Sequence, residues 1–136
     1  MERDWFFSTI CVDIDGVLVD TRNCTVGCDY SGYPRDYKRL DRESCPMKEG
    51  AVEALKELRD RGYKVVLYTA RTSLERVATE KWLSSHGLVY DELEMEKPIA
   101  FIYIDDLGYR FNNWNTTLKD LFSDPRLRCE RDEPEE

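Results

Sequence analysis

Three short apolar runs, each followed by polar residues, constrain the fold of this chain more than any other feature of its sequence. They cover residues 9–14, 64–68 and 100–104 and are rich in β-branched and aromatic side chains. Continuous apolar runs of this length are typical of strands in a parallel sheet, which are buried on both faces. Because ligands of such sheets bind beyond the carboxyl ends of the strands, the polar residues there are the first candidates for a functional site. They are residues 13–16, 69–72 and 105–106.

A helical pattern separates the first run from the second. Residues 49–61 place four apolar side chains on one helical face, and Gly62 supplies a C-terminal stop. The four are Ala51, Ala54, Leu55 and Leu58. We therefore predict an amphipathic helix that packs on the sheet.

Two more helices are predicted further along the chain. Thr72 and Glu75 form a capping box ahead of a helix that ends at Gly87. Its apolar face is predicted to carry Leu74, Ala78 and Trp82. A last helix is indicated by the spacing of Trp114, Leu118, Leu121 and Phe122.

Strands that alternate with helices predict an α/β protein with a central parallel sheet, in a three-layer α/β/α, Rossmann-like core. With 136 residues there is room for one domain, so we expect a single domain over residues 1–136 without a large cap domain. Residues 20–47 break the strand and helix rhythm, and we interpret them as a loop-rich insertion. Residues 129–136 form an acidic tail that we expect to be disordered.

Two aspartates, two residues apart, end the first run in the string CVDIDGVLVD. Asp13 and Asp15 point the same way if the strand continues, whereas Gly16 indicates a turn that lets backbone approach a ligand. Neighbouring carboxylates repel each other, and a divalent cation commonly holds such a pair together. The pair therefore indicates a metal site at the end of the first strand.

Three further motifs follow this Asp-x-Asp string in order. They are Thr69 in LYTART, Lys97 in MEKPIA, and the pair Asp105 and Asp106 in IYIDD. With them the chain resembles the haloacid dehalogenase (HAD) superfamily, whose four motifs are an Asp-x-Asp, a Ser or Thr after an apolar strand, a Lys and a terminal acidic pair. The resemblance covers residues 9–114 and looks closest to small, capless (C0-type) phosphatases.

The resemblance implies a Mg²⁺-dependent phosphatase that forms an aspartyl phosphate. Asp13 would be the nucleophile and Asp15 the general acid and base, while Thr69 and Lys97 would bind the phosphoryl oxygens. The implied metal ligands are Asp13, the backbone carbonyl of Asp15, Asp105 and Asp106, the last acting through water or by positioning Lys97. The candidate substrate-binding residues are Thr69, Ala70, Arg71 and Lys97.

Each of these residues also has a structural interpretation. Thr69 can be a turn residue at a strand end, Asp106 a helix cap, and Lys97 an ordinary exposed lysine before proline. Arg71 would reach a substrate phosphate or a second acidic group, or else pair with a surface carboxylate. His86 lies in the last turn of the second predicted helix, where a cation interacts favourably with the helix dipole, so we interpret it as structural.

The formal net charge of −8 makes a purely electrostatic nucleic-acid binder unfavourable. We therefore expect a small phosphorylated metabolite, such as a sugar phosphate, as the substrate, with a nucleotide or polynucleotide phosphatase as the alternative. Without a cap the site should be exposed, which suits a bulky substrate or closure by a partner subunit. A basic rim in the insertion could still bind a polyanion. It consists of Arg35, Lys38, Arg39 and Arg42.

No signal-peptide pattern or bilayer-spanning apolar stretch is present, which predicts a cytoplasmic protein without a membrane partner. The five cysteines favour reduced thiols over a disulfide framework. Three of them, Cys24, Cys28 and Cys45, lack the spacing of common zinc sites. Three tyrosines of the insertion either line the site entrance or pack on the core, and they are Tyr30, Tyr33 and Tyr37.

Two interpretations from other classes compete with the phosphatase. A receiver domain also carries acidic residues, Thr and Lys on a parallel sheet, but its acidic pair comes early in the chain, whereas here the pair follows Lys97. A HAD-fold binding or regulatory protein without turnover would bind metal and hydrolyse nothing.

Overall fold

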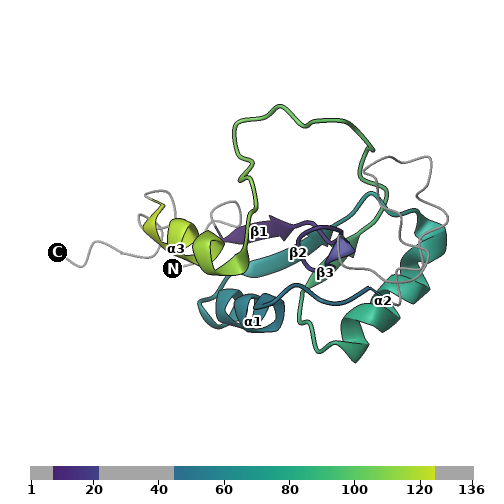
Figure 1. The fold of residues 1–136 in the computed structure, drawn as a ribbon, viewed down its shortest axis with the longest axis horizontal. Helices are drawn as coiled ribbons and strands as arrows, with labels where there is room; N and C mark the ends of the chain where they lie inside the picture. Colours follow the sequence, from purple (N-terminus) through teal and green to yellow (C-terminus); the bar gives the residue numbers. More distant parts are fainter. Residues whose placement is uncertain (1–7, 22–44, 125–136) are drawn as a thin grey trace.

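The computed structural model describes residues 8–21 and 45–124. In chain order the elements are β1 (Thr9–Val12), α1 (Ala51–Asp60), β2 (Lys64–Tyr68), the 3-10 turn η4 (Ser73–Glu75), α2 (Arg76–Ser85), β3 (Glu92–Glu94) and α3 (Trp114–Ser123). The three strands form a parallel sheet in the order β1-β2-β3, which is visible in Figure 1. The predicted α/β class with a central parallel sheet is therefore confirmed.

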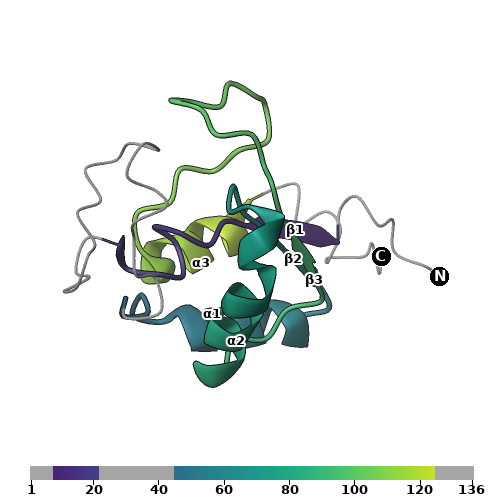
Figure 2. The same ribbon diagram turned by 90° about the vertical axis from the view of Figure 1, so that its right-hand side faces the viewer.

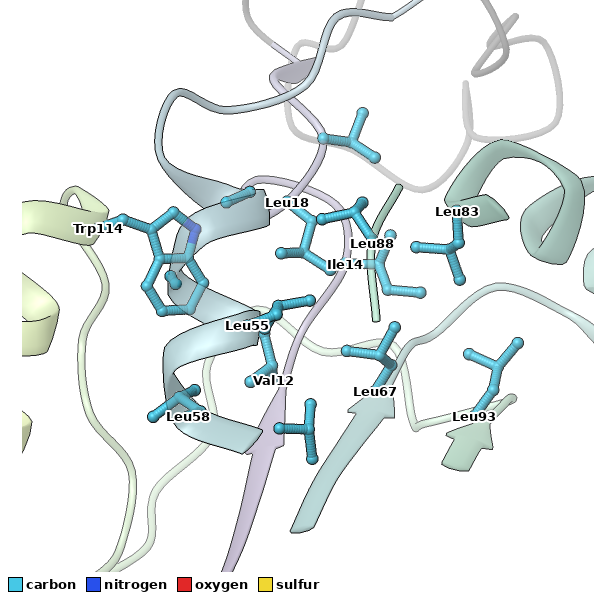
Figure 3. Close-up of a cluster of buried hydrophobic side chains, with 14 of the residues drawn as sticks. Val12, Ile14, Leu18, Leu55, Leu58, Leu67, Leu83, Leu88, Leu93 and Trp114 are labelled. Atoms are coloured by element: carbon cyan, nitrogen blue, oxygen red, sulfur yellow. The ribbon is translucent and has the colours of Figure 1, made fainter. Parts of the chain in front are cut away.

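The hydrophobic core lies between the sheet and the helices. Leu55 and Leu58 of α1 face Val12 and Leu67 of the strands (Figure 3), and all four predicted apolar residues of α1 are buried. Leu83 of α2 and Trp114 of α3 belong to the same cluster. This core holds β1 and β2 side by side, so that their carboxyl ends open on the same edge of the sheet.

The apolar face of α2 differs from the prediction. The capping box of Thr72 and Glu75 and the burial of Trp82 are confirmed, but Leu74 is 96% exposed, and the helix buries Thr79 and Leu83 together with Trp82. A 3-10 turn precedes α2 and winds more tightly than an α-helix, which takes Leu74 out of line with the residues that follow. The predicted face was therefore wrong for Leu74 and Ala78.

The third strand also differs from the prediction. β3 is formed by Glu92–Glu94, whereas residues 100–104 belong to an irregular segment, residues 95–113, that connects β3 to α3. This segment rises on the side of the sheet opposite α1 (Figures 1 and 2), and Phe101 is 97% and Ile104 91% exposed. High β-propensity does not decide which strand pairs with which neighbour. In this structure the edge of β2 is occupied by β3, whose pairing follows the bond from Asp91 N to Val65 O, 2.8 Å.

One cysteine prediction is also corrected. Cys45 is buried and disulfide-bonded, and its partner lies outside the described residues. The expectation of reduced thiols is therefore wrong for Cys45, because pairing depends on which thiols the fold brings together and not on whether their number is even. Cys11 is a free thiol.

Several predictions fall on residues that the structure does not describe. They concern most of the insertion, with its tyrosines and basic rim, and the acidic tail 129–136. Within residues 8–21 and 45–124, every helix is too short or too polar to cross a bilayer.

The contribution of the α1 face can be measured with Leu55→Ala. Leu55 is fully buried, so its truncation removes apolar contacts and leaves a cavity, and we expect a loss of about 2–5 kcal/mol in the free energy of unfolding. Lys56→Ala, on the exposed side of the same turn, is the control and should change stability by less than about 0.5 kcal/mol. Equal denaturant midpoints for the two variants would contradict this assignment of the core.

Candidate active site

The carboxyl ends of β1 and β2 bring two of the predicted site residues together. Val12 of β1 is paired with Leu67 of β2, so Asp13 and Thr69 leave the sheet from neighbouring strands. Asp13 accepts a hydrogen bond at Oδ1 from its neighbour Ile14 N, 2.8 Å, and 41% of its side chain is exposed. Asp13 is therefore held in place and still open to a ligand.

A tight turn after β1 fixes the position of Asp15. Gly16 has φ 90°, which favours glycine, and its N–H donates to Val19 O, 2.9 Å. The indole Nε1 of Trp114 donates to Val17 O in the same turn, 3.0 Å, and so ties α3 to it. The turn predicted from Gly16 is confirmed.

Lys97 reaches this turn from the end of β3. Its backbone N–H donates to Thr69 O, 2.9 Å, and Thr69 N in turn donates to Glu94 O, 3.0 Å. The Lys97 Nζ lies 3.7 Å from Asp13 Oδ2, and the rings of Tyr68 and Tyr103 have their centroids 5.1 and 4.6 Å from it. Lys97 is thus a largely buried cation beside Asp13 and not an ordinary surface lysine.

Glu96 and Ser73 hold Lys97 in this place, and the sequence analysis did not single out either of them. Glu96 is the one non-glycine residue with positive φ, 65°, among the residues described. Its Oε2 accepts from Ser73 N, 3.0 Å, and from Ser73 Oγ, 2.6 Å, while its N–H donates to Arg71 O, 2.9 Å. The sequence signal for Glu96 was its position directly before the candidate lysine, Lys97.

Burial raises the pKa of Asp13 above its ordinary value. The Lys97 ammonium and the Ile14 N–H act in the opposite direction, and the charge of Asp15 raises the pKa further, but burial is the largest cause. Asp13 therefore sits where a positive group, supplied by protein or ligand, favours its ionised form.

Arg71 is buried and forms an ion pair with the half-buried Asp15. Its Nε donates to Asp15 Oδ2, 3.0 Å, and its Nη2 to Asp15 Oδ1, 2.8 Å, while Nη1 donates to Thr79 Oγ1, 2.9 Å. The arginine is 3% exposed. The carboxylate that Arg71 pairs with is thus a site residue and not one on the surface. Thr79, which follows the predicted face residue Ala78, was missed.

Thr69 and Ala70 lie between these groups. Thr69 is fully buried, and its Oγ1 accepts a hydrogen bond from Arg71 N, 3.1 Å. Ala70 is half-buried at the bend that follows β2. Both residues therefore lie on the loop that carries Arg71, and the Thr69 carbonyl accepts the backbone N–H of Lys97.

The acidic pair Asp105 and Asp106 is not brought to this place. Both are exposed within residues 95–113, and Asp105 Oδ1 accepts from the N–H groups of Leu107, 3.2 Å, and Gly108, 2.8 Å. Across residues 8–21 and 45–124, no three Asp, Glu, His or Cys side chains are grouped to hold a metal ion. As arranged here, the predicted ligands do not form a magnesium site.

Two helix-end interpretations can be compared with the structure. The N-cap of α3 is Asn113, whose Oδ1 accepts from Thr116 N, 2.7 Å, so Asp106 is not a helix cap. His86 is the C-cap residue of α2, where its ring stacks on Trp82 at 4.0 Å and its Nδ1 lies 2.8 Å from Trp82 O. These contacts agree with the structural interpretation of His86.

Comparisons with known proteins bear on the fold. No family model and no curated protein matches the chain. Among solved structures it is similar to an MCSG target from Vibrio cholerae, with a TM-score of 0.54 and 22% identity over 76% of this chain and 83% of that one. It is also similar to chains in two structures of the Pnkp1/Rnl/Hen1 RNA repair complex, with TM-scores of 0.52 and 0.51 and 23% identity in each. These matches cover 92% and 90% of this chain but 37% and 33% of the matched chains, so the chain spans about a third of their length. At these identities the likeness shows a shared α/β fold.

Proposed function

We propose that the chain is a HAD-type phosphomonoesterase with Asp13 as its nucleophile. The observation that carries the proposal is the half-exposed Asp13 carboxylate at the end of β1, with the Lys97 ammonium 3.7 Å from its Oδ2. A carboxylate with a cation beside it can receive a phosphoryl group, because the cation offsets the negative charge that the two would otherwise bring together.

The reaction proceeds in two displacements. An Asp13 carboxylate oxygen attacks phosphorus, the bond from phosphorus to the leaving oxygen breaks, and an aspartyl phosphate forms. Water then attacks this phosphorus and regenerates the Asp13 carboxylate. Asp15 delivers a proton to the leaving oxygen in the first step and takes one from the water in the second, a role worth about 10²–10⁴ in rate.

Thr69, Ala70 and Lys97 bind the phosphoryl oxygens in this proposal. The Thr69 hydroxyl accepts a hydrogen bond from Arg71 N, which orients its own O–H as a donor. Lys97 is anchored through its backbone to Thr69 O, so the cation and the hydroxyl are held on one rigid unit. Such preorganised donors are effective because they need no rearrangement as charge develops.

Magnesium is the proposed cofactor, and it would supply positive charge that favours the phosphoryl transition state. Asp13, the Asp15 carbonyl and Asp105 would hold the metal ion. Asp106 would ligate it through a water molecule or position Lys97. Asp105 lies in the exposed segment, so these ligands meet only if that segment moves. Among the described strands β1 is at an edge of the sheet. Pairing of residues 100–104 with that edge would bury Phe101 or Ile104 and bring Asp105 to the carboxyl end of β1.

A small phosphorylated metabolite is the first candidate substrate, because the net charge of −8 repels polyanions. A nucleotide or polynucleotide end is the second candidate. It is favoured by the rings of Tyr68 and Tyr103, which are 38% and 47% exposed beside Lys97 and offer surfaces on which a base can stack. The likeness to chains of an RNA repair complex agrees with this second candidate. A cytoplasmic location and closure of the site by a partner subunit remain predictions.

The nucleophile is tested with Asp13→Asn. We expect loss of phosphate release, because an amide cannot form the aspartyl phosphate, while the exposed control Asp60→Asn keeps wild-type rates. The assay is phosphate release with Mg²⁺ from sugar phosphates, nucleotides, 3′-phosphorylated oligonucleotides and phosphopeptides. Undiminished release by Asp13→Asn would refute the mechanism. Mg²⁺ binding without release from any substrate would indicate the non-catalytic binding protein.

The same variant has a pH-dependent effect on stability. Because the pKa of Asp13 is raised on folding, its ionisation costs stability as pH rises through the folded pKa, whereas the protonated form carries no such cost. In EDTA we therefore expect the melting temperature of Asp13→Asn to exceed that of the wild type near neutral pH. The difference should vanish below about pH 4, the ordinary range for aspartate. A constant difference across this range would show that burial of the Asp13 charge costs nothing.

Metal binding should protect residues 100–104 from hydrogen exchange. If the segment pairs with β1 to supply Asp105, its amides should exchange slowly with Mg²⁺ and rapidly in EDTA, since strand pairing shields backbone N–H groups. Amides of β2 serve as the internal reference, and Asp105→Asn should abolish the protection. Unchanged exchange at 100–104 in an enzyme that Mg²⁺ activates would exclude this route to the metal site.

A further inference from the structure

The guanidinium of Arg71 is held between Asp15 on one side and Thr79 on the other. Nε and Nη2 form a two-pronged pair with the two oxygens of Asp15, at 3.0 and 2.8 Å. Nη1 is held by Thr79 Oγ1, 2.9 Å, on the buried side of α2. Three nitrogens of one side chain therefore have protein partners, in a setting that leaves Arg71 3% exposed.

The backbone of Arg71 is fixed as well. Its N–H donates to Thr69 Oγ1, 3.1 Å, and its carbonyl accepts from Glu96 N, 2.9 Å, directly before Lys97. The plane of the guanidinium is thus set by the loop after β2, by α2 and by the residues that follow β3. Among the residues that the structure describes, Asp15 is the partner of this plane that comes from the loop after β1.

Stability alone does not account well for such a pair. Moving two charges out of water costs about as much as their attraction returns, so a buried ion pair adds little net stability compared with apolar residues. A two-pronged pair does, however, fix the plane of the carboxylate, which a lysine at the same place would leave free to rotate. Proton transfer requires such a fixed direction, because its rate falls when the donor and acceptor are misaligned.

We propose that Arg71 is a positioning residue that sets the orientation of the Asp15 carboxylate for proton transfer, with Thr79 locking the guanidinium. The inference rests on the proposed phosphomonoesterase function. It assigns Arg71 to Asp15 and not to the substrate phosphate, so changes at Arg71 should act on turnover and leave substrate binding nearly intact.

The test compares Arg71→Lys and Thr79→Val on two substrates, 4-nitrophenyl phosphate and an alkyl phosphate such as glycerol phosphate. Nitrophenolate leaves without needing a proton, whereas an alkoxide needs one. We expect kcat on the alkyl phosphate to fall about 10- to 100-fold for Arg71→Lys, and on 4-nitrophenyl phosphate only about threefold, with KM changing less than about twofold. Thr79→Val should show the same pattern more weakly.

Two controls separate positioning from general damage. Thr117→Val removes a buried threonine hydroxyl from α3 and should leave both rates unchanged. In an Asp15→Asn background, adding Arg71→Lys should cost almost nothing further, because the group that Arg71 orients is already gone. Equal losses on both substrates, or full additivity with Asp15→Asn, would overturn the inference.

A measurement without turnover makes the two proposals distinguishable. The Nε–H of Arg71 should give a slowly exchanging ¹⁵N NMR signal that disappears in Asp15→Asn and weakens in Thr79→Val. A KM that rises at constant kcat in Arg71→Lys would mean that Arg71 binds substrate, and would overturn the inference alone. A protected Nε–H in a wild-type protein that releases no phosphate would overturn the proposed function, and the positioning role with it.

Discussion

The ion pair between Arg71 and Asp15 is the interaction on which the candidate site depends. It is two-pronged, its arginine is buried and its carboxylate is 15% exposed, and it joins the loop after β1 to the loop after β2. The backbone carbonyl of Arg71 also accepts a hydrogen bond from Glu96 N, which fixes the chain that leaves β3 next to the arginine. Because all three strands run parallel, their carboxyl ends lie at one edge of the sheet. The ion pair holds the loops that follow β1 and β2 in a fixed relative position.

The parts of the fold that follow from local pattern could be predicted from the sequence. The four buried residues of α1 repeat with helical spacing, β2 coincides with the predicted run, and Thr72 and Glu75 cap the turn as expected. The convergence of Asp13, Asp15 and Thr69 followed from a tertiary rule, that parallel strands present their carboxyl ends together. Each of these outcomes needs only the spacing of residues near one another in the chain, or the topology.

The remaining features depend on competition between distant segments. Residues 100–104 have higher β-propensity than Glu92–Glu94, yet the shorter segment pairs with β2, because strand pairing depends on packing against neighbours as well as on propensity. From the sequence alone, Arg71 could bind a substrate, a surface carboxylate or a buried acidic group. Only the arrangement of β1 against β2 identifies Asp15 as its partner. Cys45 is a similar case, since its disulfide depends on where the chain returns and not on how many cysteines it has.

The segment between Lys97 and Trp114 has both of its ends fixed to the site. At one end Lys97 N donates to Thr69 O, and at the other Trp114 Nε1 donates to Val17 O, in the turn that carries Asp15. The entropy needed to close a loop grows only slowly with its length, by about 0.6 kcal/mol for each doubling. Changes in the length of the chain between these two anchors would therefore cost little in loop-closure entropy, and their effect would fall on Asp105 and Asp106, which this segment carries. The position of the anchored residues and the reach of the acidic pair are thus set by different parts of the chain.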